Sequence, residues 1–378
     1  MKTKWLVAVM CMTWVVCGYL LWNHWTERDR SLSAAWVNDQ SESNSIKDEN
    51  NKVEENVEQR VENTVVTTAT IGMTGDVLLH YPIYTYPSFD FAFAAVKEKL
   101  TDIDFLLANQ ESMPAGAELG LSTYPIFNSP KYIIRDLQEA GVDMISMANN
   151  HTLDKGEIGV MKSIEHAREY AMQYVGAYDS FEDQETLRIV EVNGIRIGVL
   201  AYTYGTNIEP VPPGKDYLVN LIDYQKVADD ILRMKPAVDV IVVSLHWGPE
   251  YRLQTSQAQD ELAQYISSAG ADIIFGHHPH VLQRYEEIGE TKVFFSLGNF
   301  YSAQPYEYTN FGGIARLTVT KEKTGDISKV TIEDPRFFPT GVIKDEQNRF
   351  KVVPLKKAGQ VITYTEGWVE DHVGVPKW

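Results

Sequence analysis

The sequence predicts a mixed α/β domain that follows a single N-terminal transmembrane helix. Three observations lead to this prediction. The chain begins with a long uncharged apolar run, the remainder alternates short apolar segments with amphipathic ones, and polar side chains follow the ends of the apolar segments. Short apolar segments that alternate with helical patterns are typical of buried strands whose sheet is covered by helices.

The apolar run spans residues 5–22, and Lys2 and Lys4 precede it. A helix of this length, at about 1.5 Å per residue, nearly matches a hydrocarbon core of roughly 30 Å. No small-residue cleavage site is evident after the run. Because basic residues favour the cytoplasmic side, we expect residues 1–4 to be a cytoplasmic stub and residues 5–22 to be a transmembrane signal anchor. The C-terminal domain is then extracellular, at the cell membrane.

The composition excludes several kinds of protein. The net charge of −18 argues against a general attraction to nucleic acid. Residues 23–65 are polar and rich in acids, which predicts a solvated tether. Both cysteines, Cys11 and Cys17, lie in the first apolar segment, so no disulfide framework or thiol nucleophile can lie in the body. A metal in the body would need His, Asp, Glu or Asn ligands.

The folded body is predicted to consist of a domain over residues 66–320 and a C-terminal extension, residues 321–378, that packs on it. The Asn-Gly pair within residues 186–204 predicts a β-hairpin, and a second hairpin is expected over residues 312–334. The other predicted strands cover residues 67–76, 103–111, 142–151, 238–248, 271–280 and 292–300. The predicted helices cover residues 91–100, 131–141, 156–171, 224–235 and 257–270.

Polar side chains gather at the carboxyl ends of the predicted strands. In open α/β sheets this edge is where ligands bind, so we expect a functional site there. The side chains at or just after these ends are Asp76, Asn109, Glu111, Asn149–His151, Asp154, His246, His277–His280 and Asn299.

The segment "GHHPH" is the strongest signal among them. His278 and His280 are two residues apart, so in extended backbone their side chains would leave the same face. Pro279 restricts His278 toward extended geometry. Two imidazoles at this spacing suit one or two divalent metals. His277 would point to the opposite side, where it could support a metal ligand rather than bind the metal itself.

The other strand ends leave alternatives open. His246 follows a buried strand and therefore needs a partner or a metal. Asn150 can ligate a metal through its carbonyl oxygen, and His151 can carry a proton. Asp154 either orients His151 or caps a helix. Trp247 is either a core residue or a wall of the site.

These ligand types fit Mn, Fe, Zn or Mg rather than copper. Two such ions about 3.5–4 Å apart would clamp an attacking hydroxide and a leaving oxygen. The sequence therefore predicts hydrolysis or transfer at a phosphoryl or acyl centre.

At these residues the sequence resembles the bacterial capsule-synthesis family known as CapA or PGA_cap. The blocks "GDVLLH", "ANQE", "SMANNHTLDKG", "SLHWGPEY", "GHHPHVLQ" and "SLGNF" follow the order of its signatures between Ile71 and Phe300. The family is related to calcineurin-like metallophosphoesterases. The resemblance therefore implies a metallophosphatase-like β-sandwich flanked by helices.

The resemblance also implies a function and a set of site residues. It implies a membrane-anchored protein of poly-γ-glutamate synthesis or export that works beside membrane synthase subunits. Carried over to this chain, the family's metal ligands are Asp76, Glu111, Asn150, His246, His278 and His280. His151, with Asp154, takes the place of the proton donor. The remaining candidates, expected to contact substrate, are His80, Asn109, Trp247, His277 and Asn299.

Two departures from the family patterns are visible. Phosphoesterases have Asp-x-His in the first block, whereas Leu78 stands two residues after Asp76 here, with His80 further on. Gln110 stands where the capsule family usually has leucine.

Besides a metal-dependent hydrolase or transferase, the chain could be a non-catalytic module that binds a polyanion, or a scaffold subunit of the synthase.

Overall fold

The computed structural model describes residues 63–378. The predicted membrane segment and residues 23–62 of the predicted tether lie outside the described residues. The described residues form one compact unit. Within the described part of the chain, no helix is long and apolar enough to cross a membrane.

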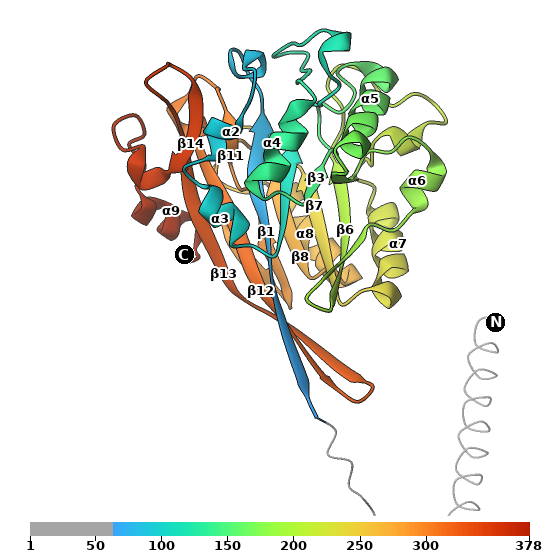
Figure 1. The fold of residues 1–378 in the computed structure, drawn as a ribbon. Helices are drawn as coiled ribbons and strands as arrows, with labels where there is room; N and C mark the ends of the chain where they lie inside the picture. Colours follow the sequence, from blue (N-terminus) through green and yellow to red (C-terminus); the bar gives the residue numbers. More distant parts are fainter. Residues whose placement is uncertain (1–62) are drawn as a thin grey trace, which may run out of the picture. The chain divides into compact units, whose positions relative to one another are not determined.

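Two β-sheets form the centre of this unit (Figure 1). The eight-stranded sheet has the order β14-β13-β12-β1-β2-β3-β4, with β11 also paired to β1. Its strands are β1 (Val65–Leu78), β2 (Phe105–Gln110), β3 (Met144–Ser146), β4 (Gln173–Val175), β11 (Asn299–Ser302), β12 (Phe311–Thr324), β13 (Ile327–Lys344) and β14 (Phe350–Pro354). The six-stranded sheet has the order β5-β6-β7-β8-β10-β9. Its strands are β5 (Ile189–Val192), β6 (Ile195–Thr203), β7 (Val240–His246), β8 (Ile273–His277), β9 (Tyr285–Ile288) and β10 (Thr291–Phe294).

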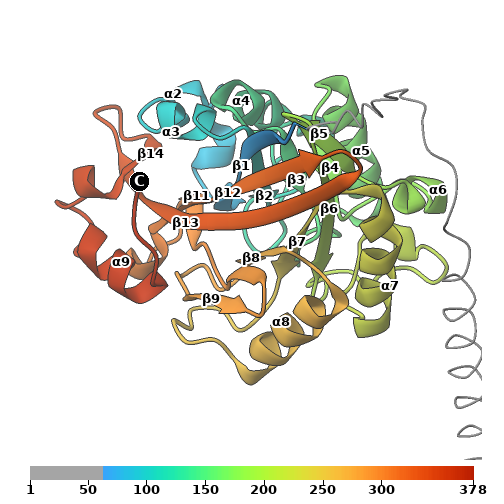
Figure 2. The ribbon, with the colours of Figure 1, turned by 90° about the horizontal axis from the view of Figure 1, so that it is seen from below.

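Helices surround the two sheets (Figure 2). They are α2 (Asp90–Phe93), α3 (Lys97–Thr101), α4 (Tyr132–Ala140), α5 (Gly156–Glu169), α6 (Phe181–Glu185), α7 (Tyr224–Met234), α8 (Gln257–Ala269) and α9 (Glu366–Val373). Helices α2 to α5 lie over the larger sheet, and α7 and α8 lie over the smaller one. The predicted mixed α/β architecture is therefore confirmed.

Strand β7 shows why the layers form. Its residues are all buried, and they alternate between two cores. Val240 and Val242 join the core between the two sheets, whereas Ile241 and Val243 join the core beneath α7 and α8. Because successive side chains of a strand point to opposite faces, a continuous apolar run is buried on both sides only when both faces are covered.

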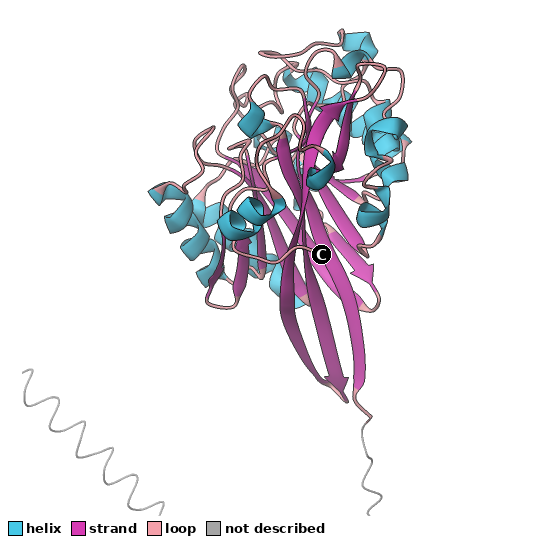
Figure 3. Cartoon of the chain, turned by 90° about the vertical axis from the view of Figure 1, so that its left-hand side faces the viewer, coloured by secondary structure: helices cyan, strands magenta, loops and turns pink. Residues whose placement is uncertain are grey.

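The predicted hairpins are present. Strands β5 and β6 pair antiparallel, and Asn193 and Gly194 between them have φ values of 52° and 77°, as a tight hairpin turn requires. Strands β12 and β13 form the second hairpin. Together with β1 they extend beyond the helices (Figures 1 and 3). The predicted domain boundary after residue 320 falls within β12.

Two predicted elements are divided in the structure. The helix predicted over residues 91–100 is split into α2 and α3, and this arrangement buries Phe93, Val96 and Leu100 together. The strand predicted over residues 292–300 becomes β10 and β11, which belong to different sheets. Gly298, with φ of 64°, provides the left-handed turn between them, which few other residues adopt easily.

Candidate metal centre

The carboxyl ends of strands from both sheets meet in one buried cluster. The larger sheet contributes Asp76 from β1, Glu111 after β2 and Asn150 after β3, and the smaller sheet contributes His246 at the end of β7. His278 and His280 follow β8. All six predicted metal ligands are at least 96% buried. Their exposed fractions are 0% for Asp76 and Glu111, 1% for Asn150 and His246, 4% for His278 and 2% for His280.

A bulge in β1 brings Asp76 into this cluster. The register of β1 with its neighbours β2 and β11 shifts at Asp76. A Cβ atom on Gly75 would lie 2.2 Å from the carbonyl oxygen of Gly298. Only glycine therefore permits the close approach of these two backbones that turns Asp76 toward the site.

Asp76 is held by nitrogen donors on three sides. Its Oδ1 accepts a hydrogen bond from Asn109 Nδ2 at 2.9 Å and lies 2.9 Å from His277 Nδ1. Its Oδ2 lies 3.2 Å from His280 Nδ1. Burial opposes ionisation, but the hydrogen bonds and charges of His277 and His280 outweigh it and hold the pKa of Asp76 well below its usual range.

Glu111 lies between two histidines without a hydrogen bond. Its Oε1 is 3.5 Å from His246 Nε2 and 3.7 Å from His280 Nε2. Neither carboxyl oxygen has a hydrogen-bond partner within the described residues. Burial raises the pKa of Glu111 well above its usual value. A buried carboxyl without a partner is costly unless something else completes its environment.

The three histidines differ in charge. Burial lowers the pKa of His278 to about 3 and that of His246 well below its usual value, so both rings are neutral, as metal ligation requires. At His280 burial also lowers the pKa, but the carboxylates of Glu111 and Asp76 outweigh it and raise the value to about 9, so this ring would release a proton on binding a metal. His246 Nε2 lies 2.8 Å from Asn150 Oδ1.

The prediction of extended backbone at the histidine pair is wrong. Strand β8 ends at His277, and His278 and His280 have φ values of 93° and 58°, in the left-handed region. Their rings nevertheless reach the same site, with centroids 5.9 Å apart. The tight turn around Pro279, rather than a strand period of two, brings them together. Non-glycine residues at positive φ are uncommon and cluster at functional sites.

These residues fit a divalent metal site. Glu111, His278 and His280 form one triad whose ligand atoms lie within 4.8 Å of one another, and Asp76, Glu111 and His246 form a second one. Glu111 belongs to both. Several buried polar atoms around it have no hydrogen-bond partner in the described part of the chain, namely Glu111 Oε1 and Oε2, Asn109 Oδ1, Asn150 Nδ2 and His278 Nδ1. Oxygen and imidazole donors of this kind suit Mn, Fe or Zn, and oxygen donors suit Mg.

His151 lies beside this cluster with a fixed orientation. Its Nδ1 is 2.8 Å from Asp154 Oδ2, and the same oxygen accepts a hydrogen bond from the backbone N–H of Phe127 at 2.7 Å. The ring of Phe127 packs edge-on against His151 at 4.7 Å. Asp154 therefore orients the imidazole, and the helix α5 begins at Gly156 with Lys155 as its N-cap, so Asp154 is not that cap.

Three of the predicted substrate contacts instead hold the ligand side chains. Asn109 and His277 both contact Asp76. Asn299 Oδ1 lies 3.0 Å from His280 Nδ1, and its Nδ2 donates to the carbonyl of Thr309 at 2.8 Å. Such partners orient metal ligands. These three side chains thus contact protein atoms, and Asn109 Oδ1 in addition has no hydrogen-bond partner within the described residues.

The other two predicted contacts lie apart from the ligands. The ring of His80 packs edge-on against Phe127 at 5.1 Å, which places it near His151. Trp247 is 2% exposed, stacks on Phe295 and donates its Nε1–H to the Phe295 carbonyl at 3.0 Å. Trp247 therefore belongs to the core beneath α8, and its side chain also lines a cavity there.

Sequence reasoning missed the aromatic residues around the cluster. The Tyr204 ring lies 4.7 Å from that of His278, and the Tyr251 ring lies 6.1 Å from that of His280. Both tyrosines are partly exposed, at 48% and 38%. Tyr204 follows β6, so its position at a strand end could have identified it. Tyr251 lies in a loop without a periodic signal, but it ends the block "SLHWGPEY", which could have identified it.

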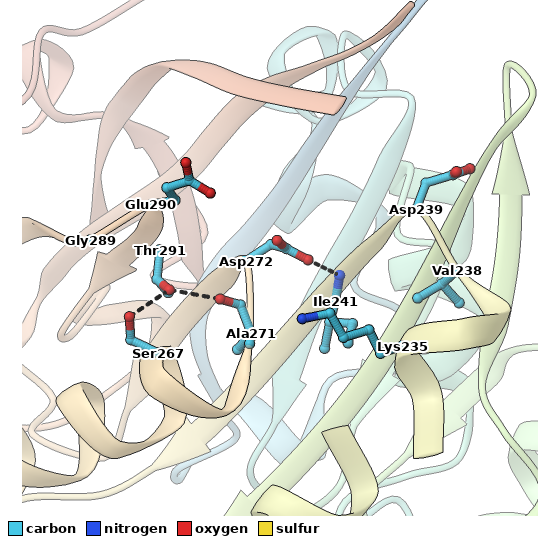
Figure 4. Close-up of a pocket in the computed structure, with 11 residues that line it drawn as sticks. Lys235, Val238, Asp239, Ile241, Ser267, Ala271, Asp272, Gly289, Glu290 and Thr291 are labelled. Carbon is cyan, nitrogen blue, oxygen red and sulfur yellow. Dashed lines mark hydrogen bonds between the residues drawn. The ribbon is translucent and has the colours of Figure 1, made fainter. Parts of the chain in front are cut away.

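A cavity of about 450 Å³ lies at the opposite edge of the smaller sheet (Figure 4). Its lining includes residues that precede the strands β7, β8 and β10. The polar groups there bind one another. Asp272 accepts from the backbone N–H of Ile241, and Thr291 Oγ1 donates to the carbonyl of Ala271. These bonds tie strand starts together and place this cavity outside the metal centre.

The fold and the site define a class of protein: two packed sheets with outer helices and, at the carboxyl ends of their strands, a cluster of residues that fits a divalent metal. The family described as bacterial capsule synthesis protein PGA_cap matches residues 70–304. The chain belongs to this family, and the predicted resemblance is confirmed.

Curated relatives agree with this assignment. The chain is 29% identical to the "Capsule biosynthesis protein CapA" of Bacillus anthracis over 70% of this chain and 67% of that protein. It is 31% identical to the "PGA biosynthesis protein CapA" of Bacillus subtilis over 59% of each chain. The chain thus spans about two thirds or less of these relatives' lengths. A solved 5'-nucleotidase precursor of Thermus thermophilus is 16% identical, with a TM-score of 0.40, over 70% of this chain and 54% of that chain. That likeness is too distant to bear on function.

Removing the support of one ligand should weaken metal binding. We expect His277→Leu to lower the affinity for Mn²⁺ by about 10–100-fold, because Asp76 loses a partner that orients it. Calorimetric titration of the metal-free protein measures this change. His166→Leu removes another buried histidine, one bound to the Pro114 carbonyl, and should leave the affinity unchanged. Equal affinities in both variants and the wild type would contradict the role of His277.

Proposed function

We propose that this protein is a metal-dependent hydrolase or transferase of capsule polymer synthesis or export, built on a metallophosphatase-like fold. Its substrate is poly-γ-glutamate, a related anionic polymer, or a phosphoester. The observation that carries the proposal is Glu111, a buried carboxyl shared by two ligand triads and without a hydrogen-bond partner in the described chain. Family membership and the printed names of the relatives support the polymer.

Six side chains would hold one or two divalent ions, Mn, Fe, Zn or Mg, at this centre: Asp76, Glu111, Asn150, His246, His278 and His280. When bound, such ions supply Lewis-acid polarisation of a phosphoryl or acyl oxygen and an activated water. The protein's own groups then orient the reactants and exclude bulk water, since the cluster is buried.

His151 is proposed to give a proton to the leaving group. Asp154 accepts a hydrogen bond from the Nδ1–H of His151 and fixes the ring. The Nε2 atom of His151 is then the nitrogen that exchanges a proton with substrate. Positioned proton transfer of this kind contributes typically about 10²–10⁴-fold to a rate.

Replacing His151 with glutamine is therefore expected to lower turnover by about 10²–10⁴-fold while metal content stays the same. The full-length protein, loaded with Mn²⁺, would be assayed on a γ-linked glutamate oligomer and on p-nitrophenyl phosphate, with and without chelator. His372→Gln, on α9, is the matched control. Undiminished turnover in His151→Gln would overturn the assignment, and no metal-dependent turnover on either substrate would overturn the enzyme proposal.

A location outside the cell follows from the predicted anchor at residues 5–22. We propose that the anchor holds the domain at the outer face of the membrane, beside the synthase subunits. Protease added to intact cells should then digest the domain. A domain that is protected until the cells are lysed would contradict this orientation.

One observation favours a second function, a non-catalytic subunit that holds the carboxylates of a polyanion. Leu78, which stands where phosphoesterases have a metal-binding histidine, is 1% exposed within the core and cannot be a ligand. A centre that lacks one ligand could bind a metal and an anion without turnover. Polymer binding that is lost on chelation, together with no turnover, would favour this function over the enzyme.

A further inference from the structure

A second cavity lies beside the metal centre, on the same edge of the smaller sheet. Its volume is about 210 Å³. Tyr204 and Trp247 line it from the ends of β6 and β7, Tyr224 lines it from the start of α7, and Ala258 and Leu262 line it from α8. The cavity thus lies between the first turns of two helices and the strand ends that they cover.

The walls of this cavity are apolar. No charged side chain lines it. Three polar groups of its walls are already engaged: Trp247 Nε1 donates to the Phe295 carbonyl at 3.0 Å, Gln259 Nε2 donates to Gln283 Oε1 at 2.8 Å, and the Tyr204 hydroxyl donates to Asn207 Oδ1 at 3.2 Å. The hydroxyl of Tyr224 is the wall group that has no such partner among the described residues. The cavity therefore offers hydrophobic contact and little hydrogen bonding.

Tyr204 connects the cavity to the metal centre. It lines the cavity, and its ring also lies 4.7 Å from that of His278 and 6.4 Å from that of His246. Tyr204 is 48% exposed, so a molecule held at the histidines could pass over its edge into the cavity. No metal ligand lines the cavity itself.

We infer that this cavity is a subsite for an apolar group, aromatic or branched aliphatic, of the substrate that the metal centre binds. This inference rests on the proposed function. Binding sites combine a few polar anchors with apolar walls that bury the rest of the ligand. The repeating unit of a γ-linked glutamate chain has no such group. The cavity therefore favours a phosphoester, or an acyl compound, that carries an apolar group next to the reacting bond.

Two phosphonates test the subsite, because they share one metal-binding group and differ in the apolar part. Calorimetric titration of the full-length, Mn²⁺-loaded protein should show benzylphosphonate binding about tenfold or more tightly than methylphosphonate, as expected for burying an aromatic ring. Ala258 lines the cavity and is exposed on α8. Ala258→Leu should fill the cavity, bring the ratio of affinities near one, and leave methylphosphonate binding unchanged.

Gln264→Leu adds the same side chain to an exposed position of α8 away from the cavity and should keep the wild-type ratio. Tyr224→Ala, which removes one wall, should lower the ratio. A ratio near one in the wild type, or a ratio that Ala258→Leu does not change, would overturn the subsite.

Failure of the metal centre would look different, since neither phosphonate would then bind. Saturation-transfer NMR with benzyl alcohol on the metal-free protein tests the cavity in that case. Binding that Ala258→Leu abolishes would support an apolar site, and no binding in the wild type would overturn it.

Discussion

Replacing Glu111 with glutamine is expected to lower the affinity for divalent metal by more than about 100-fold. Loss of a residue that merely orients a ligand costs about 10–100-fold, and Glu111 is common to both ligand triads. The substitution keeps the size of the side chain and removes its charge. It should also leave the metal-free fold no less stable than the wild type, because a buried carboxyl without a partner is removed.

Metal content by mass spectrometry and thermal unfolding with and without Mn²⁺ measure both effects. The wild type should gain stability on adding metal, since a ligand that binds only the folded state stabilises it, and Glu111→Gln should gain little. Glu98→Gln, an exposed position on α3, is the control. A variant that keeps its metal would show that Glu111 is not a ligand.

Replacing Gly276 with alanine is expected to reduce the free energy of unfolding by about 3 kcal/mol or more. Gly276 lies in β8, immediately before the histidines of the site. An added Cβ would lie 1.9 Å from the carbonyl oxygen of Phe295 and 2.5 Å from Trp247 Nε1. Both atoms are part of the packed core, so the backbone of β8 must move, and His277 moves with it.

Urea unfolding of the metal-free protein gives the size of this effect. Gly359→Ala serves as the control, because an added Cβ there meets nothing within 4 Å, and its midpoint should stay close to that of the wild type. An unfolding midpoint of Gly276→Ala equal to that of the wild type would contradict the close packing of β8 against the backbone of Phe295.

The sequence predicts that the site residues lie together, because the pattern that indicates each of them is local. Each polar residue follows an apolar strand, and the carboxyl ends of parallel strands meet at one edge. Asp76, Glu111 and His246 could therefore be placed together without knowledge of the packing. The three-residue spacing of His151 and Asp154 is compatible with an oriented imidazole and with a helix cap. In the structure Asp154 contacts His151 and does not cap the helix.

Other features depend on contacts between distant segments, which a sequence pattern does not encode. The backbone of His278 and His280 is left-handed rather than extended, at the point where β8 ends and the chain leaves the sheet. The strand predicted over residues 292–300 changes sheets at Gly298. Asn299 contacts His280 because β11 pairs with β1 at Asp76.

The central claim is that the buried strand ends hold divalent metal, and metal stoichiometry tests it most directly. The full-length protein would be stripped with chelator, reconstituted separately with Mn²⁺ and Zn²⁺, freed of excess ion and measured by mass spectrometry. The account predicts about two ions per chain, both lost in Glu111→Gln. A wild-type protein that retains no metal after reconstitution, or one whose metal content Glu111→Gln leaves unchanged, would contradict it.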